Sequence, residues 1–254
     1  MNKKLLSDEP GSVLTRLLSE LSWEGSRIKN YREGGRKFEN VLTAEVLQAL
    51  DFLPRKHFMG EVLRHAHGVN CAALNLLVEQ VEEAEMQLLP GGDYLRPNDD
   101  SHITGISVQP DGIIETSGVC CLLEAKRIKR SLFGVEQLAR EYFLVTRNCE
   151  EKLPLLFLVL GTPPPVSVNG RGIFEIVDAV RLSLSTVYEK AESHPLPLAD
   201  LDKRIPESVA WITWNELGVI VESQSGKFKS GSASIDGSVR RLTISILDAI
   251  KWHT

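Results

Sequence analysis

The sequence predicts a mixed α/β fold, in which a central β-sheet is flanked by helices and preceded by a helical N-terminal part. Apolar residues recur at helical spacing through most of the first 92 residues. Two continuous apolar runs of strand length follow, near Gly118 to Leu123 and Leu155 to Leu160, as is typical of strands buried on both faces. Helical patterns separate the later strands, so we expect helices on both faces of a mixed sheet.

The N-terminal part contains several helical patterns. Apolar residues recur at helical spacing within the first 30 residues, and a second helix is expected from Phe38 to the residues before Pro54. Residues 57–88 indicate a further helix in one or two pieces, stopped at Pro90.

Strands and helices alternate in the α/β core, residues 93–254. A short strand is expected from Ile103 to Val108, followed by a turn at Pro110 to Gly112 and then by the Gly118–Leu123 strand. The later elements expected are a helix from Phe133 to Leu144, the Leu155–Leu160 strand, a helix from Ile176 to Ala191, a strand from Ser208 to Trp214 and a helix from Val239 to Trp252. Residues 223–238 are poor in apolar side chains, so we expect them to be mobile. Nothing marks a linker, and we expect one domain spanning residues 1–254.

The composition limits the class of protein. Hydrophobic residues make up 43% and charged residues 25% of the 254 residues, as in ordinary globular proteins. No apolar run reaches the roughly 18 residues that a membrane span needs, and early acidic residues argue against a signal peptide. The four cysteines lack zinc-type spacing. We therefore expect a cytoplasmic protein with no membrane partner. A net charge of −5 means that any nucleic-acid binding depends on a local patch.

Charged residues follow directly on the first apolar run. Side chains alternate along a strand, so Glu124 and Lys126 share a face. If the strand before the turn forms a hairpin with the strand after it, Asp111 and Glu124 meet at one end of the sheet. Two carboxylates and a nearby backbone carbonyl suit Mg²⁺, and a lysine beside them can orient or deprotonate a water.

The order Pro110–Asp111, a spacer, and Glu124–Ala125–Lys126 resembles the PD-(D/E)XK motif of the restriction-endonuclease-like phosphodiesterase superfamily. The resemblance implies a restriction-endonuclease-like fold with residues 93–254 as its catalytic core. It implies a Mg²⁺-dependent endonuclease that hydrolyses phosphodiester bonds, with Mn²⁺ as a substitute cation. DNA is favoured over RNA as the partner, in host defence, restriction or repair, and a homodimer or a partner subunit fits such roles.

The resemblance also implies a role for each motif residue. Asp111 and Glu124 would hold one or two Mg²⁺ ions, and the carbonyl of Ala125 would be a further ligand. Lys126 would position the attacking water.

Two residues outside the motif match positions of the same superfamily. Glu39 corresponds to a glutamate that members carry on an N-terminal helix beside the metal, and Gln137 to a glutamine on the helix after the motif, which helps to orient the site. Tyr142 departs from the pattern, since the exonuclease-type subgroup carries a tyrosine closer to the glutamine.

The segment KRIKR, Lys126 to Arg130, places four cations directly behind the motif. In a nuclease, Arg127, Lys129 and Arg130 would contact backbone phosphates, independently of base sequence. Alternatively, they form a solvated loop that offsets neighbouring acids.

Each of these features has a simpler interpretation. Glu124 and Lys126 can be a solvent-facing pair on an edge strand, Asp111–Gly112 an ordinary turn, and Glu39 an acid favoured in the first turn of a helix. Two alternative functions remain: a catalytically inert PD-(D/E)XK-fold interaction or nucleic-acid-binding subunit of a larger assembly, and an unrelated α/β binding domain.

Overall fold

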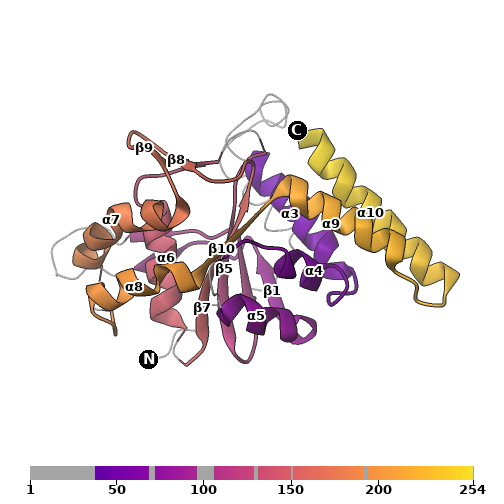
Figure 1. The fold of residues 1–254 in the computed structure, drawn as a ribbon, viewed down its shortest axis with the longest axis horizontal. Coiled ribbons are helices and arrows are strands. Elements are labelled where there is room, and N and C mark those ends of the chain that lie inside the picture. The colour runs from indigo at the N-terminus through magenta and orange to yellow at the C-terminus, as the bar shows by residue number, and fades with distance from the viewer. Residues whose placement is uncertain are drawn as a thin grey trace.

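The computed structural model describes residues 38–68, 72–95, 106–128, 131–149, 151–191 and 194–253, with the backbone alone for residues 38 and 39. Its centre is a five-stranded mixed sheet in the order β1-β4-β5-β7-β10 (Figure 1). The strands are β1 (Glu85–Leu88), β4 (Gly112–Glu115), β5 (Val119–Ala125), β7 (Leu153–Leu160) and β10 (Val209–Thr213). β5, β7 and β10 run parallel to one another, whereas β1 and β4 pair antiparallel. The predicted mixed sheet is confirmed.

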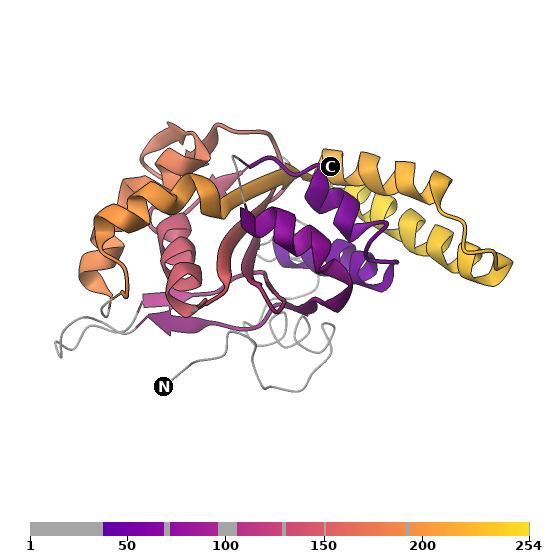
Figure 2. The same ribbon diagram turned by 60° about the horizontal axis from the view of Figure 1, so that its bottom comes forward.

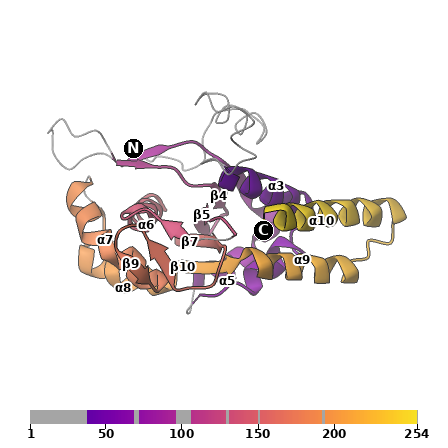
Figure 3. The same ribbon diagram turned by 90° about the horizontal axis from the view of Figure 1, so that it is seen from above.

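Helices cover both faces of this sheet, which Figure 3 shows between two helical layers. One layer holds α6 (Gln137–Asn148), α7 (Ile176–Lys190) and α8 (Leu198–Ser208), and its apolar side chains form one core with the sheet. The opposite layer holds α3 (Phe38–Phe52), α4 (Met59–Arg64), α5 (Ala72–Glu79), α9 (Trp214–Lys227) and α10 (Ala233–His253), where a second core forms. The prediction of helices on both faces is therefore confirmed.

The apolar run of the motif is the middle strand of the sheet. Every residue of β5 is buried, and β5 pairs with β4 on one side and β7 on the other. Leu123 packs into the core beneath α3, while Leu122 packs into the core beneath α6, as the alternation of a strand requires. The edge-strand interpretation of Glu124 and Lys126 is therefore wrong.

Two smaller sheets flank the central one. β2 (Asp93–Leu95) pairs antiparallel with β3 (Ile106–Val108). A second small sheet has the order β6-β8-β9, formed by β6 (Leu132–Phe133), β8 (Val166–Val168) and β9 (Gly172–Phe174). β6 lies parallel to β8, and this pairing holds the chain that leads from the motif into α6.

The N-terminal half differs from the sequence prediction in two places. Residues 85–88 form strand β1, reached through the short 3₁₀ helix η1 (Val81–Glu83), although their composition favours a helix. These residues form a strand because they pair with β4, and β1 thereby completes the antiparallel edge of the sheet. The strand before the turn, β3, pairs with β2, and it is β4 that pairs with β5. The helical pattern in the first 30 residues lies outside the described residues.

The C-terminal half contains elements that differ from the sequence prediction. Helix α6 begins at Gln137, because Leu132–Phe133 pairs as a strand, and α8 lies in a stretch for which we expected no element. Most of residues 223–238, expected to be mobile, belongs to α9 and α10. These two helices form a hairpin that projects beyond the sheet (Figures 1 and 2). Within the described ranges no helix combines the length and the apolar character that crossing a membrane would require.

Candidate active site

The strand register brings Asp111 opposite Glu124. Gly112 pairs with Leu123 in the antiparallel β4–β5 ladder, and one further step along both strands reaches the two acids. The backbone N–H of Ala125 donates to Asp111 Oδ2 at 2.8 Å, which fixes the carboxylate against β5. Both acids are buried, at 8% and 3% exposure. The two motif carboxylates thus lie at one end of the β4–β5 pair, with Asp111 directly before β4 and Glu124 in β5.

Lys126 is bound to Glu124. Its Nζ donates a hydrogen bond to Glu124 Oε1, as the shared strand face predicts. The lysine is only 5% exposed, and its Nζ lies 5.0 Å from the centroid of the Phe133 ring, within reach of a cation–π interaction. The backbone carbonyl of Lys126 accepts a hydrogen bond from Trp214 Nε1 at 2.6 Å. Trp214 at the start of α9 therefore anchors the chain where it leaves β5.

Gln137 connects helix α6 to the motif. Its Nε2 donates to Glu124 Oε1 at 2.6 Å, and its Oε1 accepts from the backbone N–H of Gly134 at 3.2 Å. The second bond fixes which end of the amide faces the glutamate, because only the nitrogen can donate. The structure thus places Gln137 beside Glu124 of the motif.

Glu141 is a member of the site that our sequence reasoning missed. It lies one helical turn after Gln137, whose Nε2 donates to Glu141 Oε1 at 3.1 Å. The side chain is 2% exposed, and Oε2 has no hydrogen-bond partner among the described residues. Burial raises the pKa of Glu141 well above its ordinary value, and the charge of Glu124 raises it further. The sequence signal was an acid on the otherwise apolar face of α6.

Tyr142 points away from the motif. Its hydroxyl donates to the backbone carbonyl of Leu201 in α8 at 2.8 Å, and the side chain is fully buried between helices. Burial raises the pKa of this phenol above its ordinary value. Tyr142 therefore holds α6 to α8 and is not part of the candidate site.

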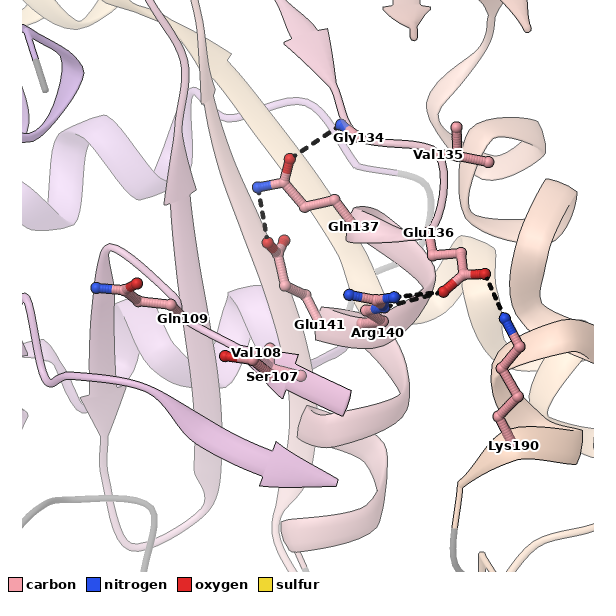
Figure 4. A pocket seen from close by; sticks show the side chains of 10 residues that line it. All are labelled: Ser107, Val108, Gln109, Gly134, Val135, Glu136, Gln137, Arg140, Glu141 and Lys190. Carbon is pink, nitrogen blue, oxygen red and sulfur yellow. Dashed lines mark hydrogen bonds and ion pairs between the residues drawn. The ribbon is translucent and has the colours of Figure 1, made fainter. Parts of the chain in front are cut away.

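A cavity of about 480 Å³ adjoins Gln137 and Glu141 at the start of α6 (Figure 4). On its other side Glu136 Oε2 accepts from Arg140 Nη2 at 2.5 Å, and Glu136 Oε1 accepts from Lys190 Nζ of α7 at 2.9 Å. The hydrogen bond from Lys190 is the main reason that the pKa of Glu136 is lowered, and Arg140 adds to it. The cavity thus lies between Gln137 and the buried Glu141 on one side and a group in which two cations share one carboxylate on the other.

The structure describes only part of the remaining predicted site. Arg127 is half-buried directly after the motif, whereas Lys129 and Arg130 lie outside the described residues. Glu39 falls in the first turn of α3, but its side chain also lies outside the description. The expected phosphate contacts of the loop and the metal role of Glu39 therefore stay predictions.

The chemistry of the described side chains suits a hydrated cation. Glu141 Oε2 is a buried oxygen with no hydrogen-bond partner among the described residues, and Gln137 Nε2 bonds both to this side chain and to Glu124. Within the described ranges, no three His, Cys, Asp or Glu side chains are arranged as a ready set of metal ligands. Mg²⁺ commonly keeps several waters and binds through one or two carboxylates and substrate phosphates. The residues therefore fit Mg²⁺ in that form, and not a closed protein cage.

Comparison of the chain with protein-family models, with curated proteins and with solved structures gave no match. The function is therefore argued from the geometry of the site.

Proposed function

We propose that the protein is a Mg²⁺-dependent nuclease of the PD-(D/E)XK type, which hydrolyses phosphodiester bonds of nucleic acid. One observation carries the proposal: Asp111, Glu124 and Lys126 lie together at the end of the central β4–β5 strand pair, with Lys126 bonded to Glu124. The order of residues in the motif and the mixed sheet around it support the same conclusion. DNA is the favoured substrate, because the resemblance is to restriction-endonuclease-like enzymes.

In this proposal Asp111 and Glu124 hold Mg²⁺, with the Ala125 carbonyl as a further ligand and Glu39 as a fourth group from α3. A cation held there would supply Lewis acidity and would lower the pKa of a water bound to it. Lys126 orients the attacking water and offsets charge that develops on the phosphate. The contact with the Phe133 ring and the ion pair with Glu124 hold Lys126 Nζ beside the carboxylate that would bind the cation.

Gln137 keeps Glu124 in place while the cation is bound. Its amide is fixed by Gly134 and donates to Glu124 Oε1, so it restricts the rotation of that carboxylate. A misplacement of about 1 Å can lower a rate by roughly 10²-fold, so a carboxylate held in its working position supports catalysis better than a mobile one. We therefore assign Gln137 as a positioning residue.

A specific observation also favours a second candidate, an inert binding subunit with the same fold. Lys126 neutralises Glu124 in a buried ion pair, and the described acids do not form a three-ligand metal group. A self-compensated pair of this kind is compatible with a purely structural role.

A cleavage assay separates the two candidates. Plasmid DNA, single-stranded DNA and RNA would be incubated with Mg²⁺, Mn²⁺ or EDTA, comparing the wild type with Glu124→Gln. Glu115→Gln is the matched control, because Glu115 is also a largely buried glutamate bonded to a lysine, Lys152, but lies at the opposite end of the β4–β5 pair. Cation-dependent cutting that Glu124→Gln loses and Glu115→Gln keeps supports the nuclease. Absence of cutting by the wild type on every substrate favours the inert subunit.

A further inference from the structure

All the buried acidic and basic side chains of the described chain, histidines aside, gather in one place. Only four Asp, Glu, Lys or Arg residues in the described ranges are buried: Asp111, Glu124, Lys126 and Glu141. Hydrogen bonds link three of them through Gln137, and Asp111 is bonded to the residue between Glu124 and Lys126. With all three carboxyl groups ionised, three carboxylates would stand against one ammonium, an excess of two formal negative charges.

Such an excess is unfavourable in a protein interior. A buried charge is costly unless it is paired or coordinates a metal, and like charges at close range raise that cost further. One divalent cation carries the charge that would balance the group. The motif residues alone do not reach this balance, since Asp111 and Glu124 with Lys126 leave only one excess negative charge.

Glu141 supplies the second excess negative charge, and its position suits a group that helps to bind the cation. One amide nitrogen, Gln137 Nε2, donates to both Glu124 and Glu141, at 2.6 and 3.1 Å, so the two carboxylates face a common point. The other oxygen of Glu141, Oε2, is buried without a hydrogen-bond partner in the described part of the chain. The residue also lines, together with Gln137, the cavity at the start of α6 (Figure 4), which gives a hydrated ion room to reach it.

We propose that Glu141 is a third carboxylate beside the divalent-cation site, which holds the hydrated ion through a bound water, completes the charge balance of Asp111, Glu124 and Lys126, and lies outside the PD-(D/E)XK motif. The inference rests on the proposed function for the presence of a cation. Glu141 is retained in the core, where it destabilises the cation-free protein, because it strengthens cation binding.

The role predicts two effects of Glu141→Gln that have opposite signs. The amide is nearly isosteric and can still accept from Gln137, but it removes an ionisable group whose burial is costly whether it is ionised or protonated. In EDTA the variant should therefore have a higher Tm than the wild type. Its Mn²⁺ dissociation constant, measured by calorimetry without any substrate, should rise at least tenfold. Glu141→Asp, which keeps the charge, should bind Mn²⁺ more tightly than Glu141→Gln.

Two reference variants make the outcomes distinguishable. Glu124→Gln should lose Mn²⁺ binding, and Glu115→Gln, whose Oε2 is likewise buried without a hydrogen-bond partner among the described residues, should bind as the wild type does. If Glu124→Gln loses Mn²⁺ while Glu141→Gln binds normally, the role of Glu141 is overturned and the proposed nuclease stands. If the wild type binds no Mn²⁺, the cation site and the nuclease are both overturned. A lower Tm for Glu141→Gln in EDTA, with unchanged Mn²⁺ affinity, would show a structural role.

Discussion

Replacing Gly161 by alanine tests whether the chain after the motif lies as closely on β7 as the structure places it. Gly161 follows directly on β7, and its N–H donates to Ser131 Oγ at 3.1 Å. A Cβ at this position would meet the carbonyl oxygens of Arg127 and Ile128 and would lie 2.5 Å from the Ile128 carbonyl carbon. All three atoms are backbone, so no side-chain rotation relieves the contact.

The size of the effect follows from this contact. Real Cβ atoms essentially never approach other heavy atoms within 3.0 Å, so the Arg127–Ile128 backbone must move by at least about half an ångström. Overpacking of this kind costs about 1–3 kcal/mol, and disturbing the bond from Trp214 to the Lys126 carbonyl adds about 1 kcal/mol. For a domain of this size a loss of about 3 kcal/mol lowers Tm by roughly 6–12 °C.

Differential scanning calorimetry measures the shift directly. Gly226→Ala is the control, because Gly226 lies in α9 and a Cβ there meets no atom within 4 Å; we expect its Tm to be equal to that of the wild type or slightly higher. If the protein is the proposed nuclease, the displaced loop should also lower its cleavage rate at saturating substrate, since Lys126 moves with it. A Tm for Gly161→Ala within about 1 °C of the wild type would refute the close approach, since the contact alone accounts for about 1–3 kcal/mol.

Three further predictions concern buried polar groups. Lys126→Met should lower the free energy of unfolding in urea by about 3–5 kcal/mol, since it breaks a buried pair. The double variant Lys126→Met with Glu124→Gln should be more stable than Lys126→Met alone. If the stability losses of the two single variants simply add, the two residues do not stabilise the fold as a pair. Tyr142→Phe should cost about 0.5–1.5 kcal/mol, because it removes the bond to α8, and should leave any cleavage rate unchanged; a slower rate at equal stability would place Tyr142 in the site. Burial lowers the pKa of His194 from 6.5 to about 4, so the unfolded chain takes up its proton first as the pH falls. The stabilisation is complete above pH 6.5 and is lost toward pH 4, and the Tm of the wild type should therefore fall more steeply over that range than that of His194→Gln.

Local pattern was enough to predict the main features of the motif. The run ending in Glu124 is continuously apolar, which is typical of a strand buried on both faces. A period of two residues predicts that Glu124 and Lys126 share one face of the strand, and the ion pair between them agrees. These features depend on neighbouring residues alone, so the sequence contains them directly.

Tertiary pairing decided what local pattern left open. Residues 85–88 have a helix-forming composition, yet β4 captures them as a strand, because pairing and burial outweigh an intrinsic preference of a few tenths of a kcal/mol per residue. The sequence also does not identify which strand pairs with β5. The segments β3 and β4 are both short and apolar, and only the packed sheet selects between them.

The membership of Glu141 in the site depends on the same kind of information. Its spacing from Gln137 shows that the two share a face of α6, but the sequence cannot show that this face meets the end of β5. That contact arises only when α6 packs on the sheet beside Glu124. The sequence by itself therefore determined the motif and its strand, whereas the packing of α6 decided which other charges surround it, because the burial of a charge is a property of the assembled core.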